Sequence, residues 1–211
     1  MGKMEYGYKL IDLAKEARAD AIKFQLFEGQ EFIDAGNIPL RYDQFEDFYK
    51  YGLTVGMPVA ASVFNKTAFE FITSIPDMHH IKFAYSMRHS PLVRGAINLG
   101  KRTVVTTNIH DSVNLPNADN LIKLCTAPRC KHADEYAILS KMNFDGLFPN
   151  RFQGFSDHSL GYLEAQSAVQ HKAHWIEKHI SLGFSDTYDC PDGRFALRGE
   201  EAIEFVWKVK K

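Results

Sequence analysis

Two short motifs end in histidines that could bind a metal ion. The sequence reads FSDH up to His158 and WIEKH up to His179. Because side chains alternate along a strand, His158 shares a face with Ser156, and His179 shares one with Glu177. If the two runs are consecutive parallel strands of a βαβ unit, their carboxyl ends lie side by side and the imidazoles converge. A lone histidine at a strand end is more often an ordinary hydrogen-bonded residue, so the predicted divalent-metal site depends on the pair.

Other strand-like runs carry a cation or a hydroxyl group. Residues 21–27 read AIKFQLF and residues 80–84 read HIKFA, so each run holds a lysine among apolar side chains. One such lysine is explained equally well by an edge strand with a solvated face. Several cations and hydroxyls at one end of a sheet suit a phosphorylated, anionic substrate instead. The residues concerned are Lys23, Ser62, Lys82, Thr106 and Ser156.

These side chains require a scaffold in which strands alternate with helices. Strand-like runs begin at Ala21, Pro58, His80, Thr103, Leu121, Phe155 and Trp175, and the fifth covers residues 121–125. Helical spacing of apolar residues predicts helices over 4–18, 42–51, 66–74, 90–99, 132–142, 160–171 and 200–208. The alternation predicts an α/β protein, a TIM-type (β/α) barrel that is incomplete with seven strands. Flavodoxin-like and Rossmann folds are disfavoured because no glycine-rich phosphate loop follows an early strand.

Composition sets the broad class of protein. Hydrophobic residues make up 45% and charged residues 24% of the 211 residues, which predicts a single folded domain over residues 1–211. The formal net charge is −1 without a basic stripe, so nucleic acid is not an expected partner. Three cysteines without a CxxC pair suit a reducing compartment. With no secretory leader and no run of about 18 apolar residues, we expect a cytoplasmic protein that does not enter a membrane.

Longer stretches resemble a known family, the N-acetylneuraminate (sialic acid) synthases and their relatives in spore-coat polysaccharide biosynthesis. The resemblance is carried by ADAIKFQLF, ASVF, IKFA, SPLVRGAINLGKRTVVTT, LCT and, above all, by GFSDHSLG with IEKHISL. It spans nearly the whole chain. The SDH and IEKH pair at this separation is fairly specific, whereas KFQ alone is a weak signal.

The resemblance implies an activity and a role for each matching residue. The family's barrel condenses phosphoenolpyruvate with an N-acylated amino sugar of the N-acetylmannosamine type, releases phosphate and forms a nonulosonic acid, using Mn²⁺ or another divalent ion such as Mg²⁺ or Co²⁺. By this resemblance His158 and His179 are the metal ligands, and Asp192 and Glu177 are the acidic residues of the reaction. A structural salt bridge is the alternative for Glu177. The substrate-binding positions are Lys23, Gln25, Ser62, Lys82, Thr106 and Ser156.

The departures from the family pattern gather on the sugar side. The family's first strand, its glutamate and its C-terminal antifreeze-like domain have no counterpart, and FAYSM after Lys82 lacks a further glutamate. Residues 127–129 replace a Tyr-Pro pair, and Gly193 stands where a histidine often occurs. A catalytically inactive anion-binding barrel and another metal-dependent barrel lyase or aldolase therefore remain alternatives. The expected partners are small molecules, phosphoenolpyruvate and an N-acylated hexosamine, with a homodimer as a candidate assembly.

Overall fold

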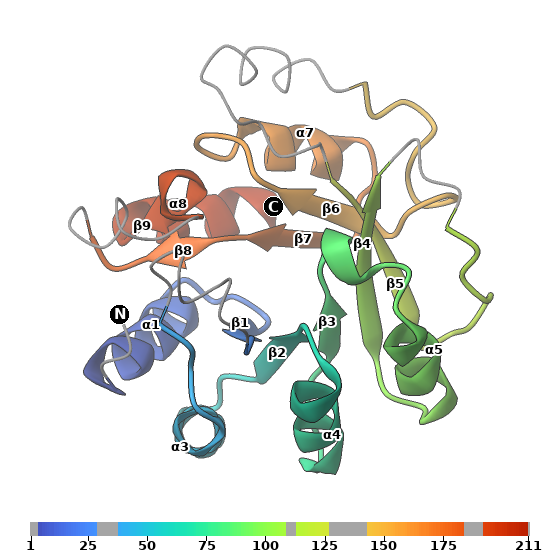
Figure 1. Ribbon diagram of the computed structural model, residues 1–211. Coiled ribbons are helices and arrows are strands. Elements are labelled where there is room, and N and C mark those ends of the chain that lie inside the picture. Colours follow the sequence, from blue (N-terminus) through green and yellow to red (C-terminus); the bar gives the residue numbers. More distant parts are fainter. Residues whose placement is uncertain (1–3, 29–37, 109–112, 127–142, 184–191, 211) are drawn as a thin grey trace.

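The computed structural model describes residues 4–28, 38–108, 113–126, 143–183 and 192–210. Figure 1 traces the chain through a curved sheet with helices on its outer side. The helix predicted over 132–142 lies outside the described residues.

Seven parallel strands form one sheet in chain order, as the sequence predicted. Their order without reversal and their curl make an incomplete TIM-type barrel, a fold that the sequence also predicted. The strands are short, and apolar side chains such as Ile22, Leu26, Ile81 and Phe83 belong to the core between the sheet and its outer helices. The strands are β1 (Ile22–Leu26), β2 (Val59–Val63), β3 (Ile81–Phe83), β4 (Thr103–Asn108), β5 (Leu121–Thr126), β6 (Gly154–Asp157) and β7 (Trp175–Lys178).

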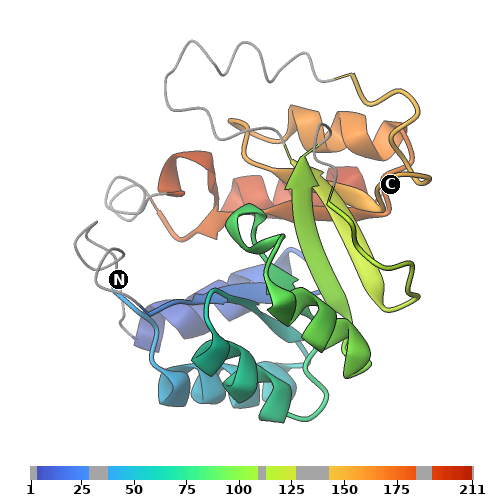
Figure 2. The same ribbon diagram turned by 45° about the vertical axis from the view of Figure 1, so that its right-hand side comes forward.

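The helices lie outside the curved sheet in both ribbon views (Figures 1 and 2). They are α1 (Met4–Glu16), α3 (Tyr42–Val55), α4 (Lys66–Ser74), α5 (Pro91–Asn98), α7 (Leu163–Gln170) and α8 (Glu200–Val209). Polar caps fix two starts: the Asn65 side chain accepts from the Ala68 amide, and Ser90 caps α5 ahead of Pro91. Helix α7 begins later than predicted, after Gly161 at φ +65°. Among the described residues, no helix is long and apolar enough to cross a membrane.

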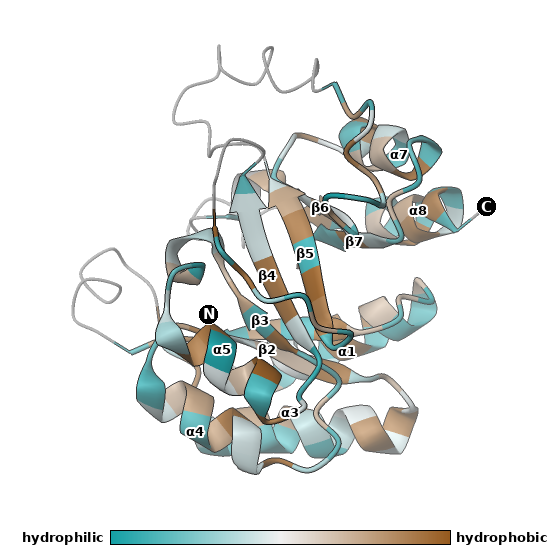
Figure 3. Cartoon of the chain, turned by 90° about the vertical axis from the view of Figure 1, so that its right-hand side faces the viewer, coloured by the Kyte–Doolittle hydropathy of each residue, from teal (hydrophilic) through white to brown (hydrophobic). Residues whose placement is uncertain are grey.

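The main apolar core lies between the sheet and helices α1, α3, α4 and α5. Leu26, Phe45, Ile81 and Phe83 are fully buried there. Burial of each such side chain contributes roughly 1.5–3 kcal/mol relative to its exposure. Figure 3 shows hydrophobic residues along β4 and β5 and hydrophilic residues on the outer surfaces of α4 and α5, so the core holds these helices against the sheet.

Gly154 permits close contact between β6 and β7. It pairs with Trp175, and a Cβ atom at Gly154 would lie 1.9 Å from the Trp175 carbonyl oxygen. Only glycine therefore fits this position. The close approach sets the spacing of the two strands whose far ends carry the predicted histidine pair.

The two outer strands of the sheet lie on either side of a cavity. Among the described residues, β1 pairs only with β2, and β7 pairs only with β6. The cavity, of about 530 Å³, is lined by both outer strands and by side chains of α1 and α8. Lys23 and Glu177 are among its lining residues, so it adjoins the candidate site.

Two very short strands extend the chain beyond β7. They are β8 (Ile180–Ser181) and β9 (Leu197–Arg198), which pair in parallel, and the Leu197 amide donates to the His179 carbonyl oxygen at 2.8 Å. This pairing returns the segment that begins at Asp192 to the end of β7. A residue distant from the strand in sequence is thereby placed beside it.

Candidate functional site

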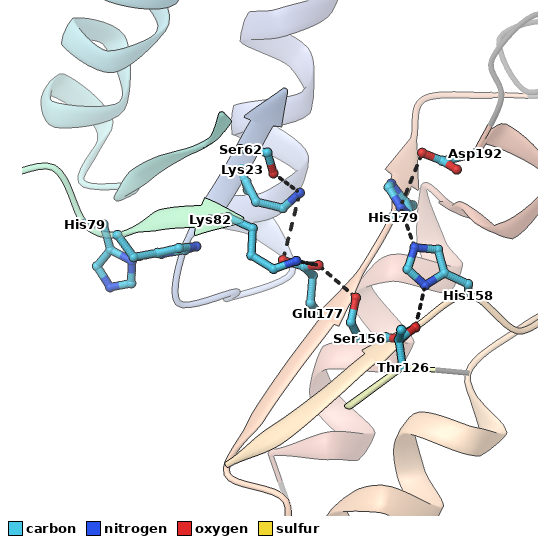
Figure 4. A network of polar contacts seen from close by, with 11 residues as sticks. Lys23, Ser62, His79, Lys82, Thr126, Ser156, His158, Glu177, His179 and Asp192 are labelled. Atoms are coloured by element: carbon cyan, nitrogen blue, oxygen red, sulfur yellow. Dashed lines mark hydrogen bonds and ion pairs between the residues drawn. The ribbon is translucent and has the colours of Figure 1, made fainter. Parts of the chain in front are cut away.

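The register of the strands places the predicted side chains on one face of the sheet. Partners in neighbouring parallel strands point the same way, and so do residues two apart within a strand. Ser62 is opposite both Gln25 and Lys82, and Ser156 is opposite Glu177. Lys23 shares the face of Gln25 by the same rule. Figure 4 shows the side chains of Lys23, Ser62, Lys82, Ser156 and Glu177 extending from different strands toward a common region.

Two lysines and one carboxylate form the centre of this region. Lys82 Nζ lies 2.7 Å from Glu177 Oε1, and Lys23 Nζ lies 3.9 Å from Glu177 Oε2. The Ser156 hydroxyl donates to Glu177 Oε1 at 2.9 Å, and Lys23 also donates to the Ser62 hydroxyl at 2.9 Å. Strands β1, β2, β3, β6 and β7 therefore meet in one polar network.

The charges in this network are largely shielded from water. Only 3% of the Lys82 side chain and 16% of the Glu177 side chain are exposed. Burial lowers the pKa of Lys82, and the nearby Glu177 carboxylate opposes that shift. Burial would raise the pKa of Glu177, but the ammonium groups of Lys23 and Lys82 hold that pKa well below its ordinary 4.5. Glu177 is therefore ionised at neutral pH.

The histidine pair predicted from the sequence lies next to this network. His158 Nε2 and His179 Nε2 are 3.3 Å apart, and Asp192 Oδ2 lies 3.7 Å from His179 Nε2. Burial lowers the pKa of His179 to about 3, so this imidazole is neutral at neutral pH. His158 follows Ser156 by two positions, and His179 follows Glu177 by two. Because a strand rises about 3.3 Å per residue, the histidine pair lies roughly 7 Å further along the strands than the lysine network.

The two imidazoles fit a single metal ion by their spacing. Metal–imidazole bonds of about 2.0–2.1 Å that meet at about 90–110° hold their nitrogen atoms roughly 2.9–3.4 Å apart. The 3.3 Å between the Nε2 atoms of His158 and His179 falls in that range. Within the described residues, no three His, Cys, Asp or Glu side chains are grouped closely enough to hold an ion. The spacing of these two nitrogens therefore suits a divalent ion that accepts imidazole ligands.

The other predicted residues lie on the same strands with different surroundings. Gln25 is half-buried on β1, opposite Ser62. Thr106 on β4 is 2% exposed, and its buried hydroxyl oxygen has no hydrogen-bond partner among the residues that the structure describes. A buried hydroxyl of this kind is unfavourable unless a ligand or water satisfies it.

Glu177 contacts the lysines and not the imidazole pair. It contacts Lys82, Lys23 and Ser156. The salt bridge considered from the sequence is thus present, and it lies within the site. The residue nearest His179 among the acidic candidates is Asp192.

Sequence reasoning missed two features of the site. Thr126 contacts His158, but the predicted strand ended one residue earlier, although a hydroxyl at a strand end was the signal used elsewhere. The second is an aromatic and imidazole cluster where β3 and β7 begin: His79 Nδ1 lies 2.9 Å from His80 Nδ1, and both rings contact Trp175. Adjacent histidines carry no periodic signal that would reveal this contact.

The fold and the site define an α/β barrel-type protein with a buried cation cluster beside an imidazole pair. The chain belongs to the NeuB family, whose model matches residues 10–211. This confirms the resemblance that was drawn from the sequence motifs.

Two curated relatives match the whole chain. It is 25% identical to the spore coat polysaccharide biosynthesis protein SpsE of Bacillus subtilis and covers 64% of that protein. It is 26% identical to the pseudaminic acid synthase of Campylobacter jejuni and covers 70% of it. The chain thus spans about two thirds of the length of these relatives.

A solved structure has the same fold. The N-acetylneuraminic acid (sialic acid) synthetase of Leptospira borgpetersenii superimposes with a TM-score of 0.82 at 20% identity, over 99% of this chain and 78% of that one. At this identity the likeness concerns the fold. It supports the barrel topology described above.

Proposed function

We propose that the chain catalyses a sialic acid synthase-like condensation of phosphoenolpyruvate with an N-acylated amino sugar of the N-acetylmannosamine type. The methylene carbon of phosphoenolpyruvate forms a bond to the aldehyde carbon of the open-chain sugar, water adds to the carbon that bears the phosphate, and phosphate leaves to give a nonulosonic acid. The observation that carries the proposal is the pair of ammonium groups, Lys23 and Lys82, beside the facing imidazoles of His158 and His179. Membership of the NeuB family supports it.

The lysine network would bind the phosphate and carboxylate of phosphoenolpyruvate. Lys23 and Lys82 supply charge-assisted hydrogen bonds, which are stronger than neutral ones and gain further strength in a site with little water. Glu177 shares both lysines and balances one of the two positive charges, so an anionic ligand meets a net charge of +1 from these three groups. The hydroxyls of Ser62, Ser156 and Thr106 would complete the binding of the anion.

The imidazole pair would hold the divalent ion, Mn²⁺ or a similar ion such as Mg²⁺ or Co²⁺. Such an ion acts as a Lewis acid that polarises a carbonyl oxygen. His158 and His179 would hold it roughly 7 Å along β6 and β7 from the anion site, close enough for one small substrate to reach both. Asp192 would accept a hydrogen bond from the sugar near the ion, because its carboxylate lies 3.7 Å from Nε2 of His179.

The proposal is tested by phosphate release from phosphoenolpyruvate, measured with a panel of N-acylhexosamines and Mn²⁺. We expect release that requires one of the sugars and is lost when His158→Ala and His179→Ala are combined. The control is His171→Ala, a partly exposed histidine whose Nε2 contacts Asp145 outside the site. Activity that survives the double substitution would contradict the metal role of the pair.

Two other outcomes separate the alternative functions. Calorimetry that detects phosphoenolpyruvate binding without turnover would favour an anion-binding barrel. Turnover of a sugar substrate without consumption of phosphoenolpyruvate would favour a lyase or aldolase. Either result rejects the condensation.

A further inference from the structure

Thr126 is the last residue of β5 and lies beside the end of β6. It is 5% exposed. Its hydroxyl oxygen lies 2.9 Å from the Ser156 carbonyl oxygen and 3.3 Å from Nδ1 of His158. One hydroxyl group thus contacts both the backbone of β6 and the imidazole that follows that strand (Figure 4).

The contact with the Ser156 carbonyl oxygen constrains where the hydroxyl hydrogen of Thr126 lies. A threonine hydroxyl has one hydrogen, and a carbonyl oxygen can only accept. The hydroxyl of Thr126 therefore donates to Ser156, and its oxygen faces His158 with a lone pair. Nδ1 of His158 must carry a hydrogen, because two facing lone pairs would repel each other. In a neutral imidazole this leaves a lone pair on Nε2.

The Nε2 atom of His158 faces Nε2 of His179 at 3.3 Å. Since His158 presents a lone pair there, the hydrogen between the two nitrogens belongs to His179. The two imidazoles are therefore not equivalent. His158 would thus already present the Nε2 lone pair that a metal ion requires. On His179, the proton would first have to leave Nε2.

We infer that Thr126 is a positioning residue that fixes His158 in the tautomer required of a metal ligand. The inference rests on the metal role proposed above, but its first readout needs no metal. Groups that orient a metal-bound histidine through its second nitrogen typically change metal affinity 10–100-fold when removed. Thr126 satisfies this description through a single hydroxyl whose direction is set by the backbone of Ser156.

The tautomer is measured by long-range ¹H–¹⁵N spectra of metal-free protein labelled in histidine, with His158 assigned from the signals lost in His158→Gln. We expect a protonated Nδ1 and an unprotonated Nε2 at His158 in the wild type and in Thr126→Ser, which keeps the hydroxyl. In Thr126→Val, which is nearly isosteric, we expect this preference to be lost. An unprotonated Nδ1 in the wild type overturns the inference.

The affinity for Mn²⁺ is measured by calorimetry on the same variants. We expect a 10–100-fold loss for Thr126→Val and an unchanged affinity for Thr126→Ser. Thr103→Val is the matched control, because it also removes a buried hydroxyl that donates to a backbone carbonyl, that of Lys101, at 2.8 Å.

Wild-type affinity in Thr126→Val overturns the inference. Equal losses in Thr126→Val and Thr103→Val also overturn it, because they show a general effect on the fold. A wild type that binds no Mn²⁺ overturns the metal role of both imidazoles, whereas a failure of phosphate release with Mn²⁺ bound rejects only the proposed reaction.

Discussion

Replacing Glu177 by glutamine removes the charge that keeps Lys82 paired. Lys82 is 3% exposed and its ammonium group lies 2.7 Å from the Glu177 carboxylate. Glutamine keeps the shape and an acceptor oxygen but leaves the lysine without its nearest counter-charge. The fold then holds a buried, uncompensated cation.

The size of the effect follows from this geometry. At an effective dielectric constant of about 20, opposite unit charges about 3 Å apart attract each other by roughly 5 kcal/mol. Removal of one member of a buried ion pair typically costs about 3–5 kcal/mol. We therefore expect Glu177→Gln to lower the free energy of unfolding by about 3–5 kcal/mol at pH 7.

The effect has a characteristic pH dependence. Burial already lowers the pKa of Lys82, and loss of Glu177 lowers it further. Between that lowered pKa and the value of about 10.4 for an unfolded lysine, the unfolded state holds more protons, so stability rises with pH. The difference between wild type and variant should therefore shrink from pH 7 to pH 10.

Urea unfolding followed by tryptophan fluorescence measures this difference, since Trp175 lies on the same strand as Glu177. Glu5→Gln is the control, because its pair with Lys9 at 2.6 Å is exposed to solvent and its loss should leave the unfolding midpoint unchanged. A loss below about 1 kcal/mol for Glu177→Gln would refute the reasoning. So would a loss that stays constant up to pH 10.

Three further predictions concern the fold around the site. Asp157→Asn should lower the free energy of unfolding by about 3–5 kcal/mol in urea titrations, because the Lys178 ammonium at 3.1 Å is 1% exposed; a loss below about 1 kcal/mol would argue against a buried pair. Burial lowers the pKa of His80 to about 3. Below about pH 6.5 the unfolded state therefore binds a proton that the folded state does not. As the pH is lowered from there, the free energy of unfolding decreases by up to about 1.4 kcal/mol per pH unit. His80→Asn should reduce the slope of the free energy of unfolding against pH between pH 6 and pH 4, by an amount that corresponds to about one bound proton. Equal slopes for the wild type and the variant would disprove the assignment. Gly154→Ala should cost at least about 3 kcal/mol in thermal or urea unfolding, because its Cβ would meet the backbone of β7. Gly183→Ala should be neutral, because a Cβ there would have no atom of the described residues within 4 Å. Similar stabilities for the two alanine variants would contradict the close approach.

The strands and the histidine pair could be predicted from local sequence. A period of two residues is sufficient to place His158 with Ser156 and His179 with Glu177, and parallel order brings the strand ends together. The structure agrees, with the two Nε2 atoms 3.3 Å apart. Local pattern and topology were enough here because both residues directly follow neighbouring strands.

Contacts that depend on the curl of the sheet could not be predicted. Lys82 and Glu177 are 95 residues apart, and no spacing rule links β3 to β7, which are not neighbours in the sheet. Asp192 reaches His179 only because β8 and β9 pair. The role of Thr126 was missed because strand propensity does not fix the last residue of a strand.

The outer strands β1 and β7 share no backbone pairing among the described residues, yet Lys23 on one and Glu177 on the other form an ion pair at 3.9 Å. Side chains thus connect the two margins of the sheet where hydrogen-bonded ladders connect its interior. An anion that bound Lys23 on β1 together with Ser156 on β6, the strand paired with β7, would add a second side-chain link across the same opening. Ligand binding should therefore slow amide hydrogen exchange in β1 and β7 more than in β4 or β5, because local opening is easiest at the margins and the ligand favours the closed state.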